Sequence, residues 1–172
     1  LSLKLEGLNR NMATQKIQES YRSIFKNISD MQGSVGKELG LTPWTKMDQE
    51  RINTFAKATE DEQWIHLDAE RCAKESPYQK PIAHGFLMLS MCSKIMYDAY
   101  EIGHVSMAIN YGLDKVRFPN ATPTGTNFRG RVILADFEMI PKGAKYKLNV
   151  TIELEGHEKP ACVAEFLALA YT

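Results

Sequence analysis

The chain has 172 residues, of which 44% are hydrophobic and 24% are charged, values that are ordinary for one globular domain. Lysine plus arginine and aspartate plus glutamate both number 21, so the charge balance favours neither nucleic acid nor an anionic membrane as a partner. No apolar run approaches the roughly 20 residues that a membrane-spanning helix requires. We therefore expect one domain over residues 12–172. Because Met12 resembles a native start, residues 1–11 are expected to be a cloning remnant or an N-terminal extension.

The first half of the chain is predicted to be mainly helical. Residues 14–31 place apolar side chains three and four positions apart, which is the spacing of an amphipathic helix. Asp48 is positioned to cap a second helix over residues 49–59. Asp68 is positioned in the same way to cap a third helix over residues 69–75.

A different kind of segment follows at residues 84–99, whose apolar side chains point in almost every direction around a helix. A helix that is apolar all round is predicted to be buried. Residues 146–154 then alternate strictly between apolar and polar, which predicts a strand. Three further strands are expected, over residues 105–118 with an interruption near Gly112, 129–140 and 160–171. Helices first and strands later indicate an α+β fold, in which an antiparallel sheet curls around the buried helix.

Cys72, Cys92 and Cys162 lie far apart and form no Cys-x-x-Cys pair, so we interpret them as reduced thiols of a cytoplasmic protein. The sequence contains no Gly-x-Gly-x-x-Gly, Walker or His-Glu-x-x-His motif. His66 and His84 could in principle bind a metal with nearby carboxylates, but their spacing matches no standard site. We therefore predict neither a metal nor a resident cofactor.

The first candidate for chemistry is the carboxylate of Asp61 with the imidazole of His66, five positions apart in a connection between two predicted helices. Addition of water to an activated double bond needs one group that removes a proton from water and another that delivers a proton to carbon. An imidazole titrates near neutral pH, and a carboxylate can hold the water. The same spacing also arises by chance, so the pair alone leaves a purely structural role open.

The start of the buried helix, at His84 and Gly85, is the second candidate. Free N–H groups at a helix N-terminus can bind a thioester oxygen as it gains negative charge, and glycine lets a ligand approach the backbone. The alternative for His84 is a structural role, in which its ring is buried in the core with its hydrogen bonds satisfied. Ser90 and Ser93, on the same helix, are either hydroxyls bonded to a preceding carbonyl or donors that line the substrate site.

Three stretches carry a family resemblance: Asp61-x-Gln63-Trp64-Ile65-His66-x-Asp68, then Ile82-Ala83-His84-Gly85-Phe86-Leu87-x-Leu89-Ser90, then Asn110-Tyr111-Gly112-Leu113-Asp114-x-Val116-Arg117-Phe118-Pro119. Together they resemble the MaoC-like dehydratases, and most closely their NodN-like branch. The resemblance covers roughly residues 35–172. Glu60 departs from the pattern, because this branch often has glycine just before the aspartate.

The resemblance implies a hot-dog fold, in which a curved antiparallel sheet wraps a long central helix, preceded here by an extra N-terminal helix. It also implies site residues. In the (R)-specific enoyl-CoA hydratases of this superfamily, an aspartate and a histidine five residues later hold the catalytic water, which matches Asp61 and His66. The backbone donor to the thioester oxygen falls on Gly85, beside His84. A helix serine that assists matches Ser93, with Ser90 as the other candidate.

The function implied is that of an acyl-thioester hydratase or dehydratase, which reversibly adds water to a 2-enoyl-CoA or related thioester and forms a 3-hydroxyacyl thioester. Coenzyme A would enter as part of the substrate. A homodimer or a dimer of dimers is expected, with sheets paired side by side. Two alternatives stay open: a protein that binds acyl thioesters without catalysis, and a hot-dog thioesterase.

Overall fold

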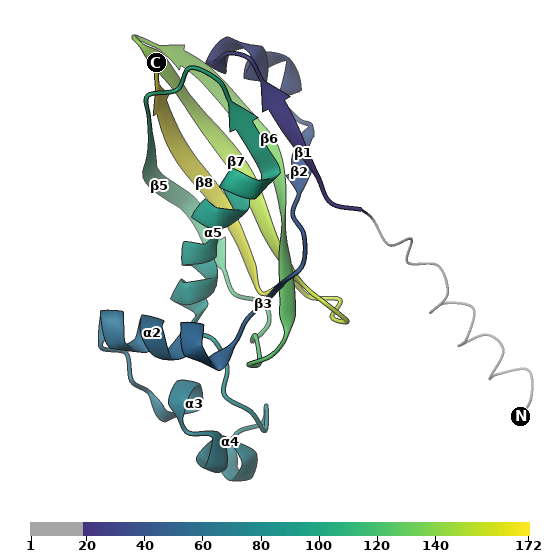
Figure 1. The fold of residues 1–172 in the computed structure, drawn as a ribbon, viewed down its shortest axis with the longest axis vertical. Helices are drawn as coiled ribbons and strands as arrows, with labels where there is room; N and C mark the ends of the chain where they lie inside the picture. The colour runs from purple at the N-terminus through teal and green to yellow at the C-terminus, as the bar shows by residue number, and fades with distance from the viewer. Residues whose placement is uncertain (1–18) are drawn as a thin grey trace, which may run out of the picture.

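An eight-stranded sheet forms most of the structure, a computed structural model that describes residues 19–172 (Figure 1). The strands are β1 (Tyr21–Phe25), β2 (Glu38–Leu41), β3 (Thr45–Lys46), β4 (Tyr100–Ile102), β5 (Met107–Arg117), β6 (Asn127–Ile140), β7 (Gly143–Leu154) and β8 (Cys162–Tyr171). The helices are the 3-10 helix η1 (Ile28–Ser34), α2 (Gln49–Thr59), α3 (Trp64–Leu67), α4 (Ala69–Glu75) and α5 (Gly85–Ala99). The sheet order is β4-β1-β2-β6-β7-β8-β5, with β3 paired to β6. The prediction for residues 1–11 lies outside the described residues.

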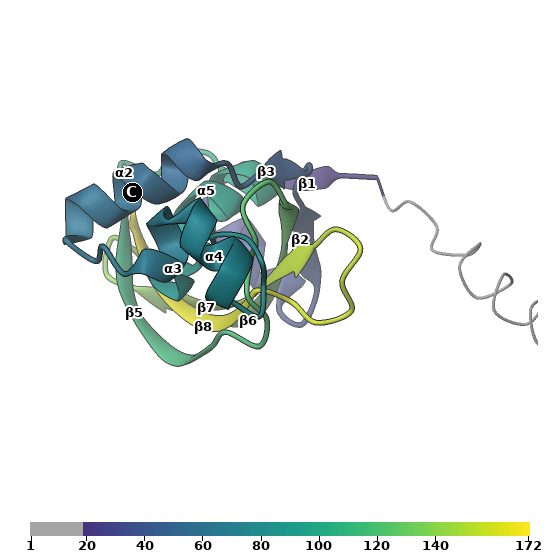
Figure 2. The same ribbon diagram turned by 90° about the horizontal axis from the view of Figure 1, so that it is seen from below.

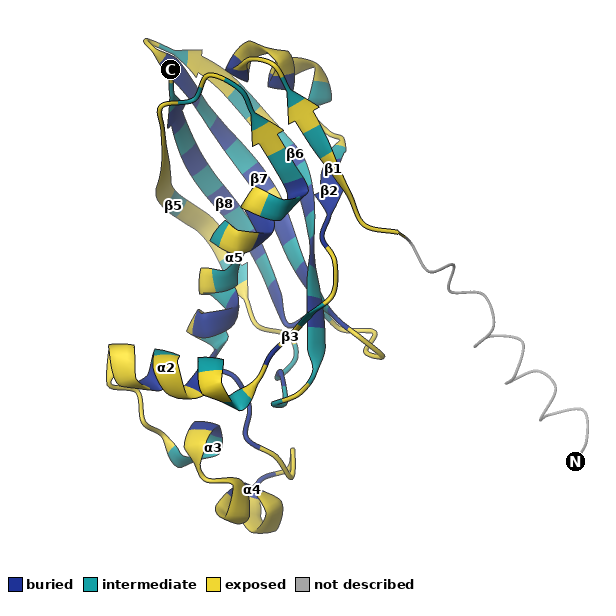
Figure 3. Ribbon diagram, in the orientation of Figure 1, coloured by how far each residue is buried: buried dark blue, intermediate teal, exposed yellow. Residues whose placement is uncertain are grey.

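The long antiparallel strands β6, β7 and β8 curve around α5, while α2, α3 and α4 gather at the end of the molecule where α5 begins (Figures 1 and 2). The sheet face turned toward α5 carries the core. On β7, alternate residues are buried, as the bands of Figure 3 show, and these are the residues whose alternation predicted a strand. The predicted α+β architecture is therefore confirmed.

Two glycines determine how closely α5 approaches the sheet. On β6, a Cβ atom at Gly130 would lie 2.1 Å from Cγ2 of Ile95, a buried side chain of α5. On β2, a Cβ atom at Gly40 would lie 2.2 Å from the carbonyl oxygen of Ala99. Both distances are far below van der Waals contact, so only residues without a side chain allow α5 to rest on the sheet at this spacing.

The helices α2 and α4 begin and end where the sequence predicts. The Asp48 carboxylate accepts a hydrogen bond from the backbone N–H of Arg51 at 2.9 Å, and Asp68 accepts from the N–H of Arg71 at 2.9 Å. Both are N-caps of the expected kind. The predicted interruption of β5 is also present, as a register shift against β8 between Asn110 and Gly112. Among residues 19–172, no helix has the length and apolar character needed to cross a membrane.

The predicted N-terminal helix is wrong over its described part. Tyr21–Phe25 form the strand β1, and Ile28–Ser34 form a 3-10 helix, while residues 14–18 lie outside the described part. β1 pairs antiparallel with β2 and parallel with β4, so two remote segments satisfy its backbone groups. Aromatic and β-branched side chains suit such a position, and tertiary pairing overrides the helical spacing.

One side of α5 is not covered within the protomer, which differs from the expected helix wrapped in all directions. The side chains of Phe86 and Tyr97 are 69% and 74% exposed. β5, the strand at the sheet edge beside α5, is exposed along almost its whole length. We call the exposed apolar residues of this region the α5–β5 surface; they are Phe86, Tyr97, Met107, Ile109, Tyr111, Leu113 and Phe118.

The contact between α5 and β6 yields a stability prediction. Gly130→Ala should lower the free energy of unfolding by about 1–3 kcal/mol, because its methyl group overlaps Ile95 and forces α5 off the sheet. Urea denaturation followed by circular dichroism measures the change. Gly33→Ala is the matched control, since no atom lies within 4 Å of the place its methyl group would take, and its stability should be unchanged. Equal stability of Gly130→Ala and wild type would contradict the packing described.

Candidate active site

Asp61 follows the turn that ends α2. Glu60 caps this helix in the left-handed conformation, with φ of 60° and ψ of 18°. That conformation costs a residue with a side chain about 1–2 kcal/mol, which accounts for the glycine that the NodN-like resemblance places here. The turn separates Asp61 from α2 and leaves its carboxylate 55% exposed. The candidate water-binding group therefore faces solvent at the end of a rigid helix.

His66 lies on α3, a helix of four residues where the sequence predicted only a connection. Its Nδ1 lies 2.7 Å from the carbonyl oxygen of Ile82, and because a carbonyl only accepts, Nδ1–H is the donor. Nε2 is then the unprotonated nitrogen of the neutral ring. Burial lowers the pKa of His66, while the hydrogen bond to Ile82 acts in the opposite direction. The ring is thus neutral at pH 7, with Nε2 able to accept a proton.

His84 connects Asp61 to His66. Its Nε2–H donates to the backbone oxygen of Asp61 at 2.9 Å, and the same nitrogen lies 4.0 Å from the Asp61 carboxylate. The His84 and His66 rings stack with centroids 3.6 Å apart and planes at 25°, and the Phe55 ring lies 5.0 Å from that of His84. His84 is only 2% exposed. This geometry favours a structural, anchoring role for His84, but the histidine is only partly satisfied, because its buried Nδ1 has no hydrogen-bond partner among the described residues.

Gly85 is the first residue of α5. His84 gives this helix no side-chain cap, so the N–H groups of the first turn, that of Gly85 included, have no partner within the helix. A Cβ atom at Gly85 would lie 3.0 Å from the ring of Phe118, which fills the space beside the backbone. Glycine is therefore required for packing here, in addition to leaving a helix N-terminus open for a developing negative charge.

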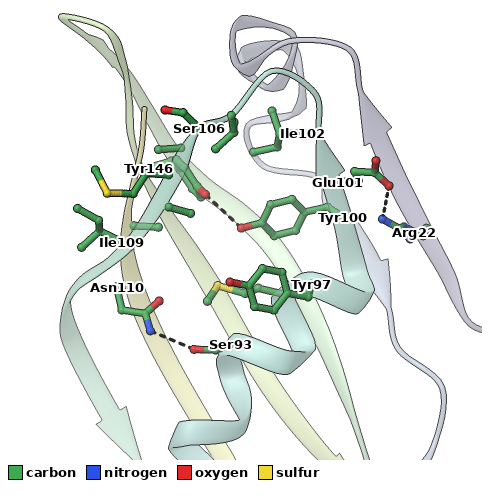
Figure 4. Close-up of a pocket in the computed structure, with 16 residues that line it drawn as sticks. Arg22, Ser93, Tyr97, Tyr100, Glu101, Ile102, Ser106, Ile109, Asn110 and Tyr146 are labelled. Atoms are coloured by element: carbon green, nitrogen blue, oxygen red, sulfur yellow. Dashed lines mark hydrogen bonds and ion pairs between the residues drawn. The ribbon is translucent and has the colours of Figure 1, made fainter. Parts of the chain in front are cut away.

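The two serines lie farther along α5. The Ser90 hydroxyl donates back to the carbonyl of Phe86 at 2.8 Å, one of the two roles expected for it. The Ser93 hydroxyl accepts from the amide of Asn110 at 3.0 Å and lines a cavity of about 430 Å³ between the second half of α5 and the first half of β5 (Figure 4). Asp61 is not among the residues that line this cavity. Of the predicted site residues, only Ser93 lines this cavity.

Asp61, His66 and His84, which we call the histidine cluster, are close enough to raise the question of a metal. Their ligand atoms lie within 4.8 Å of one another. Each ring, however, already directs one nitrogen at a backbone carbonyl, and the remaining lone pairs lie in nearly parallel stacked planes. A zinc ion needs donors that converge at about 2.0–2.1 Å. The arrangement suits an acid–base pair better than a metal centre, and the absence of a resident metal stays a prediction.

Comparison with known proteins identifies the family. The family model of the MaoC-like domain matches residues 30–155, more than half of the chain. The chain belongs to the MaoC-like family. It is 41% identical over 142 residues to 3-hydroxyacyl-thioester dehydratase Z of Mycobacterium tuberculosis, covering 82% of this chain and 93% of the relative. It is 41% identical over 146 residues to nodulation protein N of Rhizobium meliloti, covering 84% and 91%.

Solved structures agree on the fold of this MaoC-like chain. An R-hydratase from Pseudomonas aeruginosa superposes with a TM-score of 0.65 at 20% identity, covering 80% of this chain and 81% of the other. An (R)-hydratase from A. caviae superposes with a TM-score of 0.61 at 19% identity, covering 73% and 89%. The hot-dog architecture predicted from the resemblance is confirmed.

The MaoC-like site also contains groups that the sequence did not reveal. The carbonyl of Ile82 fixes the tautomer of His66, and the ring of Phe118 covers Gly85. A backbone acceptor leaves no side-chain signal in a sequence. Phe118 does stand in the third stretch of the resemblance, but only the fold brings it to the start of α5.

The environment of His66 predicts its titration directly. In the folded protein its pKa should lie below the ordinary value of 6.5, because burial disfavours the charged ring. NMR titration of the imidazole C–H resonances measures this, and a His66→Gln variant assigns the signal. A His66 midpoint at or above 6.5 would contradict the neutral, proton-accepting ring described.

Proposed function

We propose that this MaoC-like protein is an acyl-thioester hydratase and dehydratase, which reversibly adds water to a 2-enoyl thioester and forms a 3-hydroxyacyl thioester. One observation carries the proposal: Asp61 and His66, whose neutral ring has a free Nε2, cluster with His84, the residue directly before the open N–H groups at the start of α5. The 41% identical relative from M. tuberculosis is named a 3-hydroxyacyl-thioester dehydratase, which supports the same reaction class.

In the hydration direction, one water molecule donates hydrogen bonds to the Asp61 carboxylate and to Nε2 of His66. As the water oxygen bonds to carbon 3, its proton moves to Nε2 and the double-bond electrons move toward the thioester carbonyl. The N–H of Gly85 stabilises the negative charge that develops on the carbonyl oxygen. The proton on His66 is then delivered to carbon 2, which restores the neutral ring. Dehydration follows the same steps in reverse.

The proposed reaction requires no resident cofactor, because polarisation comes from the backbone and proton transfer from the side chains. Coenzyme A or an acyl carrier would enter as part of the substrate. A thioesterase would instead direct the water at the carbonyl carbon and break the carbon–sulfur bond, so release of free thiol distinguishes the two reactions. Cys72, Cys92 and Cys162 are all buried, which removes them as nucleophiles.

Hydration of crotonyl-CoA, followed as loss of enoyl absorbance, tests the proposal. Asp61→Asn and His66→Gln should each lower kcat/KM by about 10²–10⁴-fold, since each removes a group that holds the water or transfers its proton. Glu62→Gln is the matched control, because it neutralises the neighbouring exposed carboxylate, and it should retain wild-type turnover. Unchanged activity in both site variants would refute the residue assignment. Release of free thiol without hydration would favour the thioesterase alternative.

We further propose that two copies of the chain pair through the outer edges of their β5 strands. β5 is the last strand of the sheet order, and its outer edge has no strand neighbour among residues 19–172. Exposed edge strands with apolar side chains are normally covered, and β5 carries the exposed apolar residues Met107, Ile109, Tyr111 and Leu113. A two-fold axis pairs identical edges antiparallel, which extends the sheet across both protomers.

Antiparallel pairing has a consequence for the site. The Arg117 end of β5 leads to Phe118 and Gly85, whereas the Met107 end borders the cavity of Figure 4. In the dimer, the Met107 end of one strand lies beside the Arg117 end of the other. In the proposed dimer, the cavity of one protomer, with Ser93, therefore lies next to the start of α5 in its partner.

Leu113→Lys places a charge in the middle of the proposed β5 interface, where the leucine is 39% exposed in the protomer. We expect the variant to be monomeric by light scattering and to lose most crotonyl-CoA turnover, because each active site then lacks its partner's cavity. Ile24→Lys is the control, since this 72% exposed side chain lies on β1, away from the β5 edge, and its charge should leave the dimer intact. A dimeric Leu113→Lys protein would contradict the proposed pairing.

A further inference from the structure

The cavity between α5 and β5 is lined by both apolar and polar residues, and two of its polar groups are tyrosine hydroxyls (Figure 4). Met96, Ile109 and Ala168 are among its apolar lining residues. Tyr100, at the start of β4, and Tyr146, on β7, extend their hydroxyls toward each other across it, with the two oxygens 3.3 Å apart. Tyr146 is 3% exposed, so its hydroxyl is removed from bulk water.

The two hydroxyls do not satisfy each other. Hydroxyl–hydroxyl hydrogen bonds are commonly about 2.7–2.8 Å long, so a separation of 3.3 Å marks a weak contact. Two phenols carry two O–H donors, and their mutual bond uses one of them. Neither hydroxyl has another hydrogen-bond partner in the described part of the chain. Burial raises the pKa of both tyrosines, so both keep their protons. One O–H donor of the pair is therefore available to an acceptor on a ligand that enters the cavity.

The charge around the cavity limits what this donor can bind. The cationic side chain at the cavity, Arg22, already pairs with Glu101 at 2.6 Å, and both are about half exposed at the rim. No other lysine or arginine is among the lining residues. A carboxylate brought to the tyrosines would thus be buried without a counter-ion, which is strongly unfavourable. A neutral acceptor oxygen, such as that of a ketone or an alcohol, meets no such penalty.

We propose that this cavity binds the acyl chain of the substrate and that the hydroxyl pair of Tyr100 and Tyr146 recognises a neutral oxygen on that chain. The preferred substrates are then enoyl thioesters whose chain carries an oxo or hydroxyl group beyond the reacting carbons. The inference rests on the proposed function. It uses the dimer geometry given above, in which the cavity lies beside the partner's oxyanion-binding helix start and can receive the chain attached there.

A panel of equal-length substrates tests this preference. Plain 2-decenoyl-CoA is compared with its 5-oxo, 7-oxo and 9-oxo derivatives, so that the oxygen is carried to different depths. At least one oxo derivative should exceed plain 2-decenoyl-CoA in kcat/KM by about 10-fold, the effect of one well-made hydrogen bond. The double variant Tyr100→Phe/Tyr146→Phe should lose this ratio, which is taken between two substrates of the same protein, so that a general change in activity cancels.

Tyr97→Phe is the matched control, because Tyr97 lines the same cavity but its hydroxyl is not part of the pair. It should keep the preference of the wild type. The proposal is overturned if no oxo derivative is preferred, if the preference survives in the double variant, or if Tyr97→Phe alone abolishes it.

A binding measurement separates this inference from the proposed catalysis. Isothermal titration with saturated decanoyl-CoA and its 5-oxo, 7-oxo and 9-oxo derivatives requires no turnover. Tighter binding of one oxo derivative by wild type, lost in the double phenylalanine variant, would support the cavity assignment even if crotonyl-CoA is not hydrated. Equal binding of all four compounds would reject the assignment even if hydration is observed.

Discussion

The close packing of α5 against the sheet is the constraint on which the rest of the structure depends. Gly130 and Gly40 let the helix approach β6 and β2 so closely that Ile95 and Ala99 occupy the space of the missing side chains. This contact fixes the direction of α5 and therefore the position of its first turn. The chemistry is assembled at that turn, because the open N–H groups belong to the helix itself and the segment leading into it supplies the anchors for the histidine cluster.

These anchors are hydrogen bonds from histidine rings to backbone carbonyl oxygens. The carbonyl of Ile82 holds His66, and His84 holds the backbone of Asp61, so the α2–α3 segment is tied to the residues that introduce α5. The Asp61 carboxylate stays exposed while the His66 imidazole is buried and neutral. A small set of backbone hydrogen bonds thereby gives two neighbouring side chains different environments, which is what a water-activating pair requires.

The sequence predicted best what is encoded locally. Asp48 and Asp68 predict the helices that follow them because a cap and its helix are adjacent in the chain. The alternation along β7 predicts which of its faces is buried. β1 was missed because its hydrogen-bond partners are the remote strands β2 and β4. At the site, the spacing of Asp61 and His66 was visible, and the structure brings the two side chains into one cluster with His84, while their catalytic roles stay a prediction. The bond from His84 to a main-chain oxygen has no counterpart in side-chain patterns.

Because the strands are synthesised in chain order, β5 is made well before the strand with which it pairs. Its one neighbour in the sheet is β8, and the chain must still produce β6 and β7 before β8 exists. During translation, this segment of eleven residues, with apolar side chains at Met107, Ile109, Tyr111 and Leu113, therefore emerges before its partner strand. Segments of that kind are where newly made chains associate with each other. The yield of folded protein should depend on how quickly residues 162–171 follow, or on a chaperone that shields β5 until they do.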